Sequence, residues 1–215
     1  MLILSLLRRL SSAVIYWHGS WVIYSYDATA QGDGKLDAAV QTYDAEHLPV
    51  GVVKQALQER YGRFEYKLRL REMLRHGGKC LVLMDQGKVA SFGWIRGWKP
   101  FRRRYGWLAR DAFLLSSYWT MPDFRGKGLY GRLLAHTIAV ARKADNVPIF
   151  IWTDPENHAS QRGIEKAGFK CLGVFEVRQA FFRLINTYRK IRTSPQEACV
   201  QSSANGPDPS FEQNE

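Results

Sequence analysis

The chain has 215 residues, of which 46% are hydrophobic, and carries a formal net charge of +11. This length and composition suffice to bury one hydrophobic core, and no apolar run reaches the roughly eighteen residues that would predict a membrane-spanning helix. The three cysteines, Cys80, Cys171 and Cys199, have no paired spacing. Neither a disulfide framework nor a metal site is therefore expected, and a reduced, cytoplasmic protein fits best.

The positive charge is concentrated in the body of the chain. Residues 193–215 hold four acidic residues, no Lys or Arg, and many polar residues and prolines, which predicts a disordered acidic tail. The predicted domain, residues 1–192, can therefore attract nucleic acid, anionic lipid or a polyanionic small molecule. Its densest basic cluster, Lys99–Arg104, is accompanied by no recognised nucleic-acid-binding motif, so nucleic acid is the least favoured of these partners.

The first residues form an apolar segment. Its apolar side chains recur at helical spacing, at Ile3, Leu6, Leu7, Leu10 and Val14. Arg8 and Arg9 follow the first apolar residues, whereas a secretory signal has its positive charge before them. We expect a helix that packs on the body, and contact of residues 1–15 with a membrane surface is the alternative.

The rest of the body alternates strands with helices. The patterns predict strands over 21–26, 80–84, 89–95, 111–121, 148–153 and 169–177. They predict helices from Pro49, over 64–74, over 129–144, and from Asn157 to Gly168. Residues 180–191 fit a strand or a helix. We expect an α/β fold with one mixed, twisted sheet of about six to seven strands and helices on both faces, in which strands 111–121 and 148–153 pair in parallel.

A glycine-spaced turn before helix 129–144 is the strongest functional signal, and it reads Arg125-Gly126-Lys127-Gly128. The glycines allow backbone angles and a close approach that side chains forbid. The free N–H groups and the positive dipole end of the helix point at the turn. Arg125, Lys127 and Arg132 add positive charge, so the turn is predicted to hold a phosphate.

The turn is not a nucleotide loop of the form G-x-x-x-x-G-K-[ST], because Leu129 follows Gly128. It resembles the coenzyme A loop of the GCN5-related N-acetyltransferases (GNAT), written [RQ]-x-x-G-x-[GA]. Arg125 and Gly128 match this pattern, and Tyr130 departs from its last, small residue. Residues 157–160 (N-H-A-S) and 165–169 (E-K-A-G-F) are similar to the second signature of the same superfamily.

The resemblance covers residues 78–177 well and the first 77 residues weakly. It implies an acyl-CoA N-acyltransferase fold in which strands 111–121 and 148–153 splay apart around the pantetheine arm of coenzyme A. The coenzyme-binding residues that it implies are Trp119, Thr120, Met121, Arg125, Gly126, Lys127, Gly128, Leu129, Tyr130, Asn157 and Ser160. It further implies transfer of an acetyl or other acyl group from acyl-CoA, without a metal, to a primary amine such as an amino sugar or a peptide or protein amine.

The catalytic residues are harder to predict. Many family members carry a glutamate base and a tyrosine acid at the positions that match Trp152 and Ile164 here. Asp111, at the start of the central strand, is a candidate general base, and a charge at the strand edge is the alternative. Positioning, with an N–H group at the thioester oxygen, would suffice if solvent takes the proton.

A different class of function is also compatible with the sequence. The protein could be a non-enzymatic basic module that binds anionic lipid or a polyanion through its first helix and Lys99–Arg104. Turnover of acetyl-CoA with a panel of amines separates this module from an enzyme. The sequence leaves open the acceptor, the acyl length and the oligomeric state, including a homo-oligomer.

Overall fold

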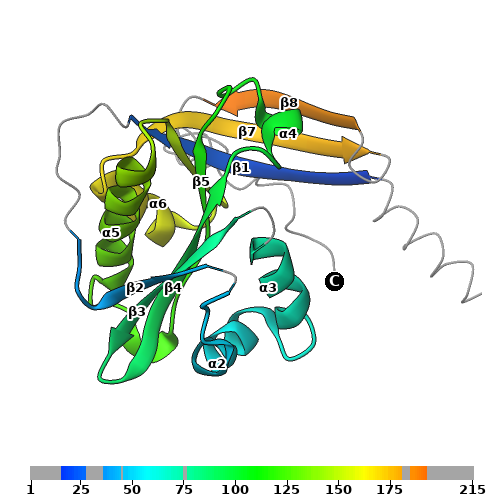
Figure 1. Cartoon of the computed structure of the whole chain (residues 1–215). Coiled ribbons are helices and arrows are strands. Elements are labelled where there is room, and N and C mark those ends of the chain that lie inside the picture. Colours follow the sequence, from blue (N-terminus) through cyan, green and yellow to red (C-terminus); the bar gives the residue numbers. More distant parts are fainter. Residues whose placement is uncertain (1–15, 28–35, 45, 75–76, 181–184, 193–215) are drawn as a thin grey trace, which may run out of the picture. The chain divides into compact units, whose positions relative to one another are not determined.

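The computed structural model describes residues 16–27, 36–44, 46–74, 77–180 and 185–192 (Figure 1). The predicted first helix and the predicted acidic tail lie outside these residues. The described residues fall into two compact units. The larger comprises residues 24–152 and 158–170, and the smaller comprises the rest. The structure confirms the predicted mixed α/β class, and its described residues form eight strands rather than six to seven.

The larger unit holds most of the elements. In chain order these are β2 (Val40–Tyr43), α2 (Val50–Tyr61), α3 (Tyr66–Leu74), β3 (Lys79–Asp85), β4 (Lys88–Gly97), α4 (Arg102–Tyr105), β5 (Phe113–Thr120), the 3-10 turn η1 (Pro122–Phe124), α5 (Leu129–Ala144), β6 (Ile149–Thr153) and α6 (His158–Lys166). The strands follow the order β2-β3-β4-β5-β6. Neighbouring strands are antiparallel from β2 to β5, and β5 and β6 pair in parallel as expected.

The smaller unit contains most of β1 (Tyr16–Tyr26), β7 (Lys170–Ala180) and β8 (Ile185–Arg192). Their order is β1-β7-β8, and β7 pairs with β8 in antiparallel register. Residues 180–191, which fitted a strand or a helix, are therefore a strand from Ile185 onward. β1 begins at Tyr16, five residues before the predicted start.

Three short elements were not predicted. In β2 only the first of four residues is buried, so the strand carries too few alternations for a recognisable pattern. The helix α4 is a single turn within the basic segment 99–104 and its flank, a region expected only to connect two strands. It forms next to Trp98, whose buried ring lies 5.2 Å from that of Phe150 and whose Nε1 donates to Ala109 O at 2.9 Å. The third element, η1, is a single 3-10 turn that begins at Pro122.

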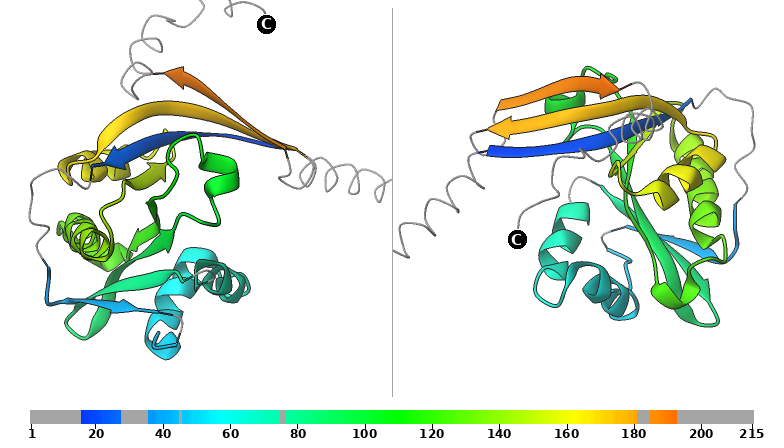
Figure 2. Two further views of the ribbon diagram at one scale, coloured as in Figure 1. Left: turned by 45° about the horizontal axis from the view of Figure 1, so that its top comes forward. Right: turned by 180° about the vertical axis from the view of Figure 1, so that it is seen from behind.

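Helices cover both faces of the sheet in the larger unit. Figure 2 shows α5 and α6 on one side of β3, β4 and β5, and α2 and α3 on the other. The apolar side chains of α2 and α3 pack against buried residues of β3 and β4, including Cys80, Val82, Phe92 and Trp94. On the opposite side α5 buries its predicted apolar stripe, including Leu133, Leu134 and Ile138. None of the helices in the described part of the chain is long and apolar enough to cross a membrane.

A bulge interrupts the pairing of β4 with β5. Phe92 is opposite Trp119 and Trp94 is opposite Ser116, so Gly93 faces two residues of β5. One of these two, Ser117, has a left-handed φ of 54°, which is uncommon for a residue other than glycine. The pairing of β5 with β6 ends just before the bulge, at Leu115 and Ile151. The two parallel strands thus share only a short ladder, and the rest of β5 is free of β6.

Gly93 makes room for the ring of Tyr118, the second of these two residues. A Cβ atom at Gly93 would lie 2.6 Å from two atoms of this ring. The Tyr118 hydroxyl donates to Thr137 Oγ1 at 2.8 Å, and Thr137 Oγ1 donates to Leu133 O at 2.7 Å. Burial raises the pKa of Tyr118, so this phenol stays protonated and continues to donate. The ring therefore joins β5 to α5 across β4.

Replacement of Gly93 by alanine is expected to destabilise the protein by about 1–3 kcal/mol, because the methyl group would overlap a fully packed aromatic ring. Gly97→Ala is the matched control, since an added Cβ at this position in the same strand meets nothing within 4 Å. Urea denaturation of both variants measures the difference. Equal unfolding free energies for the two variants would contradict this account of Tyr118 packing.

Candidate functional site

The turn before α5 has the conformation that an anion site requires. Gly126 and Gly128 have φ values of 77° and 72°, and an added Cβ at either position would meet nothing within 4 Å. Glycine is thus favoured here by the backbone conformation rather than by crowding. Gly128 is the N-cap of α5; no side chain caps this helix end, and its first turn holds no acidic residue. The N–H groups of the first turn therefore point into the loop.

The three cationic side chains predicted around this turn have different contacts. Arg132 is paired with Asp37 at 2.8 Å, so its charge is compensated. Lys127 Nζ lies 5.0 Å from the ring centre of Phe124. Arg125 turns back along β5, where its Nε donates to Thr120 O at 3.2 Å. The side chains of Lys127 and Arg125 are exposed next to the helix end.

Only part of the predicted pantetheine-binding backbone faces away from β4. Met121 N–H donates to Ala90 O at 2.9 Å, and Trp119 O accepts from Ser91 Oγ at 3.0 Å. Backbone groups alternate between the two edges of a strand, so those of Thr120 face the side where β5 has left β6. Of the three predicted residues, Thr120 is the one whose backbone lies at the open edge.

Tyr130, which replaces the small last residue of the loop pattern, bridges α5 and α6. Its hydroxyl lies 3.1 Å from Ser160 Oγ, and its ring meets that of Tyr118 edge-on with centres 5.8 Å apart. An added Cβ at Gly163 would lie 2.5 Å from a Tyr130 ring atom. Burial raises the pKa of Tyr130 to about 12, and the bond with Ser160 opposes this rise. The phenol is therefore protonated and held beside Ser160, another predicted coenzyme-binding residue.

Gly163, inside the helix α6, is the sequence signal for this contact. Glycine in a helix interior costs roughly 1 kcal/mol relative to alanine, so its presence at position 163 suggests a close approach by another group. The approaching group is the Tyr130 ring. The Tyr130 ring thus packs into the space that a side chain at position 163 would occupy.

Asn157 belongs to the smaller unit and is described with it. Its N–H donates to Asp154 O at 3.0 Å, and Asp154 Oδ1 accepts from Glu156 N–H at 2.8 Å. These bonds form the turn that leads from β6 to α6. Asp154 therefore shapes this turn with both its backbone and its side chain.

The positions of the expected acid and base carry packing side chains. Trp152 lies against Tyr105, with ring centres 4.8 Å apart, and Ile164 is fully buried. Asp111 is exposed, and its Oδ1 accepts from the Ala112 N–H at 2.9 Å. It precedes the first residue of β5, about 30 Å along the chain from Thr120 at the usual rise per residue. This placement favours the strand-edge role over that of a general base.

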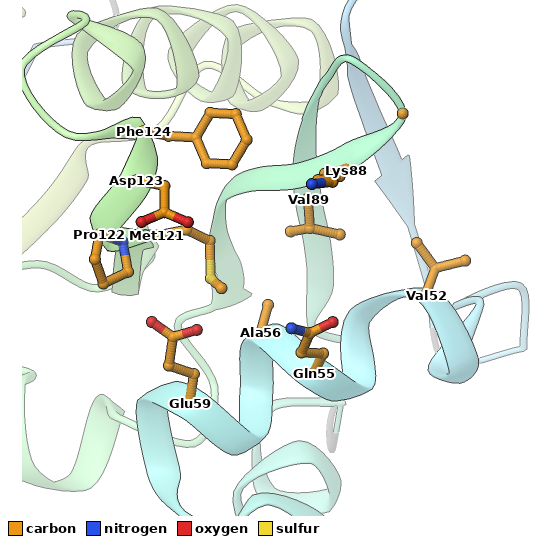
Figure 3. Close-up of a pocket in the computed structure, with 11 residues that line it drawn as sticks. Val52, Gln55, Ala56, Glu59, Lys88, Val89, Met121, Pro122, Asp123 and Phe124 are labelled. Carbon is orange, nitrogen blue, oxygen red and sulfur yellow. The ribbon is translucent and has the colours of Figure 1, made fainter.

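A cavity of about 650 Å³ lies on the α2 side of the sheet, before the glycine turn. Its lining residues come from α2, from the turn between β3 and β4, and from the segment that follows β5. Figure 3 shows the carboxylates of Glu59 and Asp123 on either side of the Met121 side chain. This cavity was not predicted from the sequence, although four of its lining residues have the spacing of one helix face, namely Val52, Gln55, Ala56 and Glu59.

The sequence matches the model of the acetyltransferase (GNAT) family over residues 41–169, which is more than half of the chain. The chain belongs to this family. The matched range includes the glycine turn, Ser160 and Gly163. No curated protein matches the sequence.

Solved structures share this fold at low sequence identity. A GNAT-family protein of Novosphingobium aromaticivorans is 17% identical, with a TM-score of 0.54 over 74% of this chain and 63% of its own. A GNAT-family acetyltransferase of Colwellia psychrerythraea is 16% identical, with a TM-score of 0.54 over 81% and 61%. One of Sphaerobacter thermophilus is 16% identical, with a TM-score of 0.52 over 82% and 56%. The chain thus spans less than two thirds of the length of these structures, and the likeness concerns the fold.

The packing of Tyr130 on Gly163 predicts a strong coupling between the two positions. Gly163→Ala should destabilise the protein by about 1–3 kcal/mol, because the methyl group would overlap the ring. The same substitution in a Tyr130→Ala background should cost little, which chemical denaturation of the double-mutant cycle measures. Gly131→Ala, where an added Cβ meets nothing within 4 Å, is the control. Additive effects of the two substitutions would rule out the contact.

Proposed function

We propose that the protein transfers an acetyl or other acyl group from acyl-CoA to a primary amine. The observation that carries this proposal is the open edge of β5, which leads directly into the uncapped N-terminus of α5. An extended pantetheine arm can add to a strand edge through main-chain hydrogen bonds. The pyrophosphate that follows it suits the left-handed glycine turn and the free N–H groups of the helix. Membership of the acetyltransferase (GNAT) family supports the same ligand.

The proposed coenzyme-binding residues are Gly126, Lys127 and Gly128 of the turn, Thr120 at the open edge, and Ser160 on α6. The acceptor would enter from the cavity on the α2 side. The neutral amine attacks the thioester carbonyl carbon, a C–N bond forms, and the C–S bond breaks with release of the coenzyme A thiolate. The amine proton leaves to solvent. Catalysis then rests on positioning and on N–H groups near the thioester oxygen.

The coenzyme site is tested by a pair of variants at Gly128. Asn and Asp are similar in size and both tolerate a left-handed backbone, but only Asp places a negative charge where the pyrophosphate is proposed to bind. We expect calorimetry to give a coenzyme A affinity at least about tenfold weaker for Gly128→Asp than for Gly128→Asn. Gly97→Asp, with the same charge in β4, should bind like the wild type. Equal affinities for the Asp and Asn variants at position 128 would refute the site.

The mechanism is tested at Asp111. A positioned acid or base contributes about 10²–10⁴-fold to a rate, and Asp111 is remote and exposed. Asp111→Asn should therefore lower turnover by no more than about tenfold. The rate should follow the fraction of neutral amine as the pH rises. A neutral-range inflection in the pH–rate profile that disappears in Asp111→Asn would identify Asp111 as a general base and contradict this mechanism. Absence of acyl transfer to any amine would favour the non-enzymatic module.

A further inference from the structure

Two guanidinium groups approach the same indole ring. Arg60 Cζ, from the last turn of α2, lies 4.6 Å from a ring centre of Trp119. Arg125 Cζ, from the segment after η1, lies 4.8 Å from the Trp119 ring. The face of an aromatic ring attracts cations, which explains why each side chain rests there. It also brings two like charges close to each other, because both guanidinium groups lie near the same ring.

This pair of charges is uncompensated. The ion pairs of the described residues involve other basic groups, namely His47, Arg69, Arg132 and Arg178. Both Arg60 and Arg125 are exposed. The Trp119 Nε1–H is buried and has no acceptor within the described part of the chain. Around this ring the described residues thus offer several hydrogen-bond donors and two positive charges, and no described carboxylate forms an ion pair with either guanidinium group. A phosphate or carboxylate supplies what is missing.

The pair lies on the face of the sheet opposite α5. Successive side chains of a strand point to opposite faces, and Tyr118 points to α5, where it bonds Thr137. Trp119 accordingly packs against the core cluster that α2 and α3 form with the sheet. An anion bound by Arg60 is therefore separated by β5 from the side where Tyr118 and α5 lie. This separation favours an anion of the acceptor over a phosphate of the coenzyme.

The cavity on this face has the complementary charges. Glu59 and Asp123 line it, Glu59 directly precedes Arg60, and Met121 packs against the same core cluster as Trp119. Two carboxylates suit a protonated amine, and two nearby guanidinium groups suit an anion. A ligand with both groups would satisfy both sets of charges.

We propose that Arg60 and Arg125 bind an anionic group of the acyl acceptor, which is therefore a primary amine that also carries a phosphate or a carboxylate. This inference rests on the proposed function and names its substrate class. Glu59 and Asp123 attract the ammonium group to this cavity, and the neutral amine that attacks the thioester forms when solvent takes its proton. The anionic group accepts hydrogen bonds from the two guanidinium groups over the Trp119 ring.

Matched acceptors with and without the anion test this proposal when each rate is referred to the concentration of neutral amine, because the anion also changes the pKa of the acceptor's amine. Glucosamine and glucosamine 6-phosphate form the phosphate pair, and phenylalaninamide and phenylalanine form the carboxylate pair. Release of the coenzyme A thiol at saturating acetyl-CoA gives kcat/KM for each. We expect the anionic member of at least one pair to be preferred at least about tenfold, as a charged hydrogen bond provides. That pair identifies which anion the site takes.

Arg60→Gln should reduce the ratio of kcat/KM for the anionic acceptor to that for its neutral partner to nearly one. The change should come mainly from a higher KM for the anionic acceptor. Lys54→Gln, which removes an exposed positive charge from the same helix outside the cavity lining, should retain the preference. An unchanged preference in Arg60→Gln, with transfer to amines intact, would overturn the inference and leave the proposed function standing. A weaker coenzyme A affinity in Arg60→Gln, without an acceptor effect, would also overturn it, because Arg60 would then contact the coenzyme.

Binding provides a readout that does not need turnover. If no amine is acylated, the proposed function fails, and calorimetry with coenzyme A-saturated protein still measures the binding of glucosamine 6-phosphate and phenylalanine against their neutral partners. Tighter binding of an anionic member that is lost in Arg60→Gln would support the anion site. Equal binding of both members of each pair would reject it.

Discussion

The backbone of β5 around Ser117 determines where this sheet opens. The left-handed residue there lets two residues of β5 face Gly93, and the pairing with β6 ends immediately before it. The bulge contains Tyr118 and directly precedes Trp119, and these two side chains point to opposite faces of the sheet. The Tyr118 hydroxyl bonds to Thr137 of α5. The Trp119 ring contacts the guanidinium groups of Arg60 and Arg125. A single local distortion thus separates the proposed phosphate-binding end from the proposed acceptor face.

The parts of the site that the sequence predicted are encoded locally. The glycine turn and the start of α5 follow from residues within a few positions of one another, because a left-handed turn needs glycine and a helix shows its period over one stretch. The parallel pairing of β5 with β6 follows from the length of the connection through α5. The predicted bounds of α5 agree with the structure for the same reason.

The parts that were missed depend on residues far apart in the chain. Arg60 and Trp119 meet only after α2 packs on the sheet, and nothing near Arg60 in the sequence indicates an aromatic partner. Likewise, the cavity is formed by three segments that each look ordinary. Asp111 stays a prediction by residue type, and its exposed position before β5 fits the alternative of a charge at the strand edge. Short elements such as β2 and α4 were not predicted, because so few residues show no measurable period of apolar side chains.

The two contacts between a glycine and a tyrosine ring also constrain how this sequence can change over evolutionary time. Gly93 accommodates Tyr118, and Gly163 accommodates Tyr130. In each pair the volume absent from one position is present at the other, so a larger residue in place of the glycine is tolerated only with a smaller one in place of the tyrosine. Homologues that restore a small residue at position 130, as the family pattern has it, are free to carry a side chain at position 163. Their two helices would then meet through that side chain instead of through a phenol.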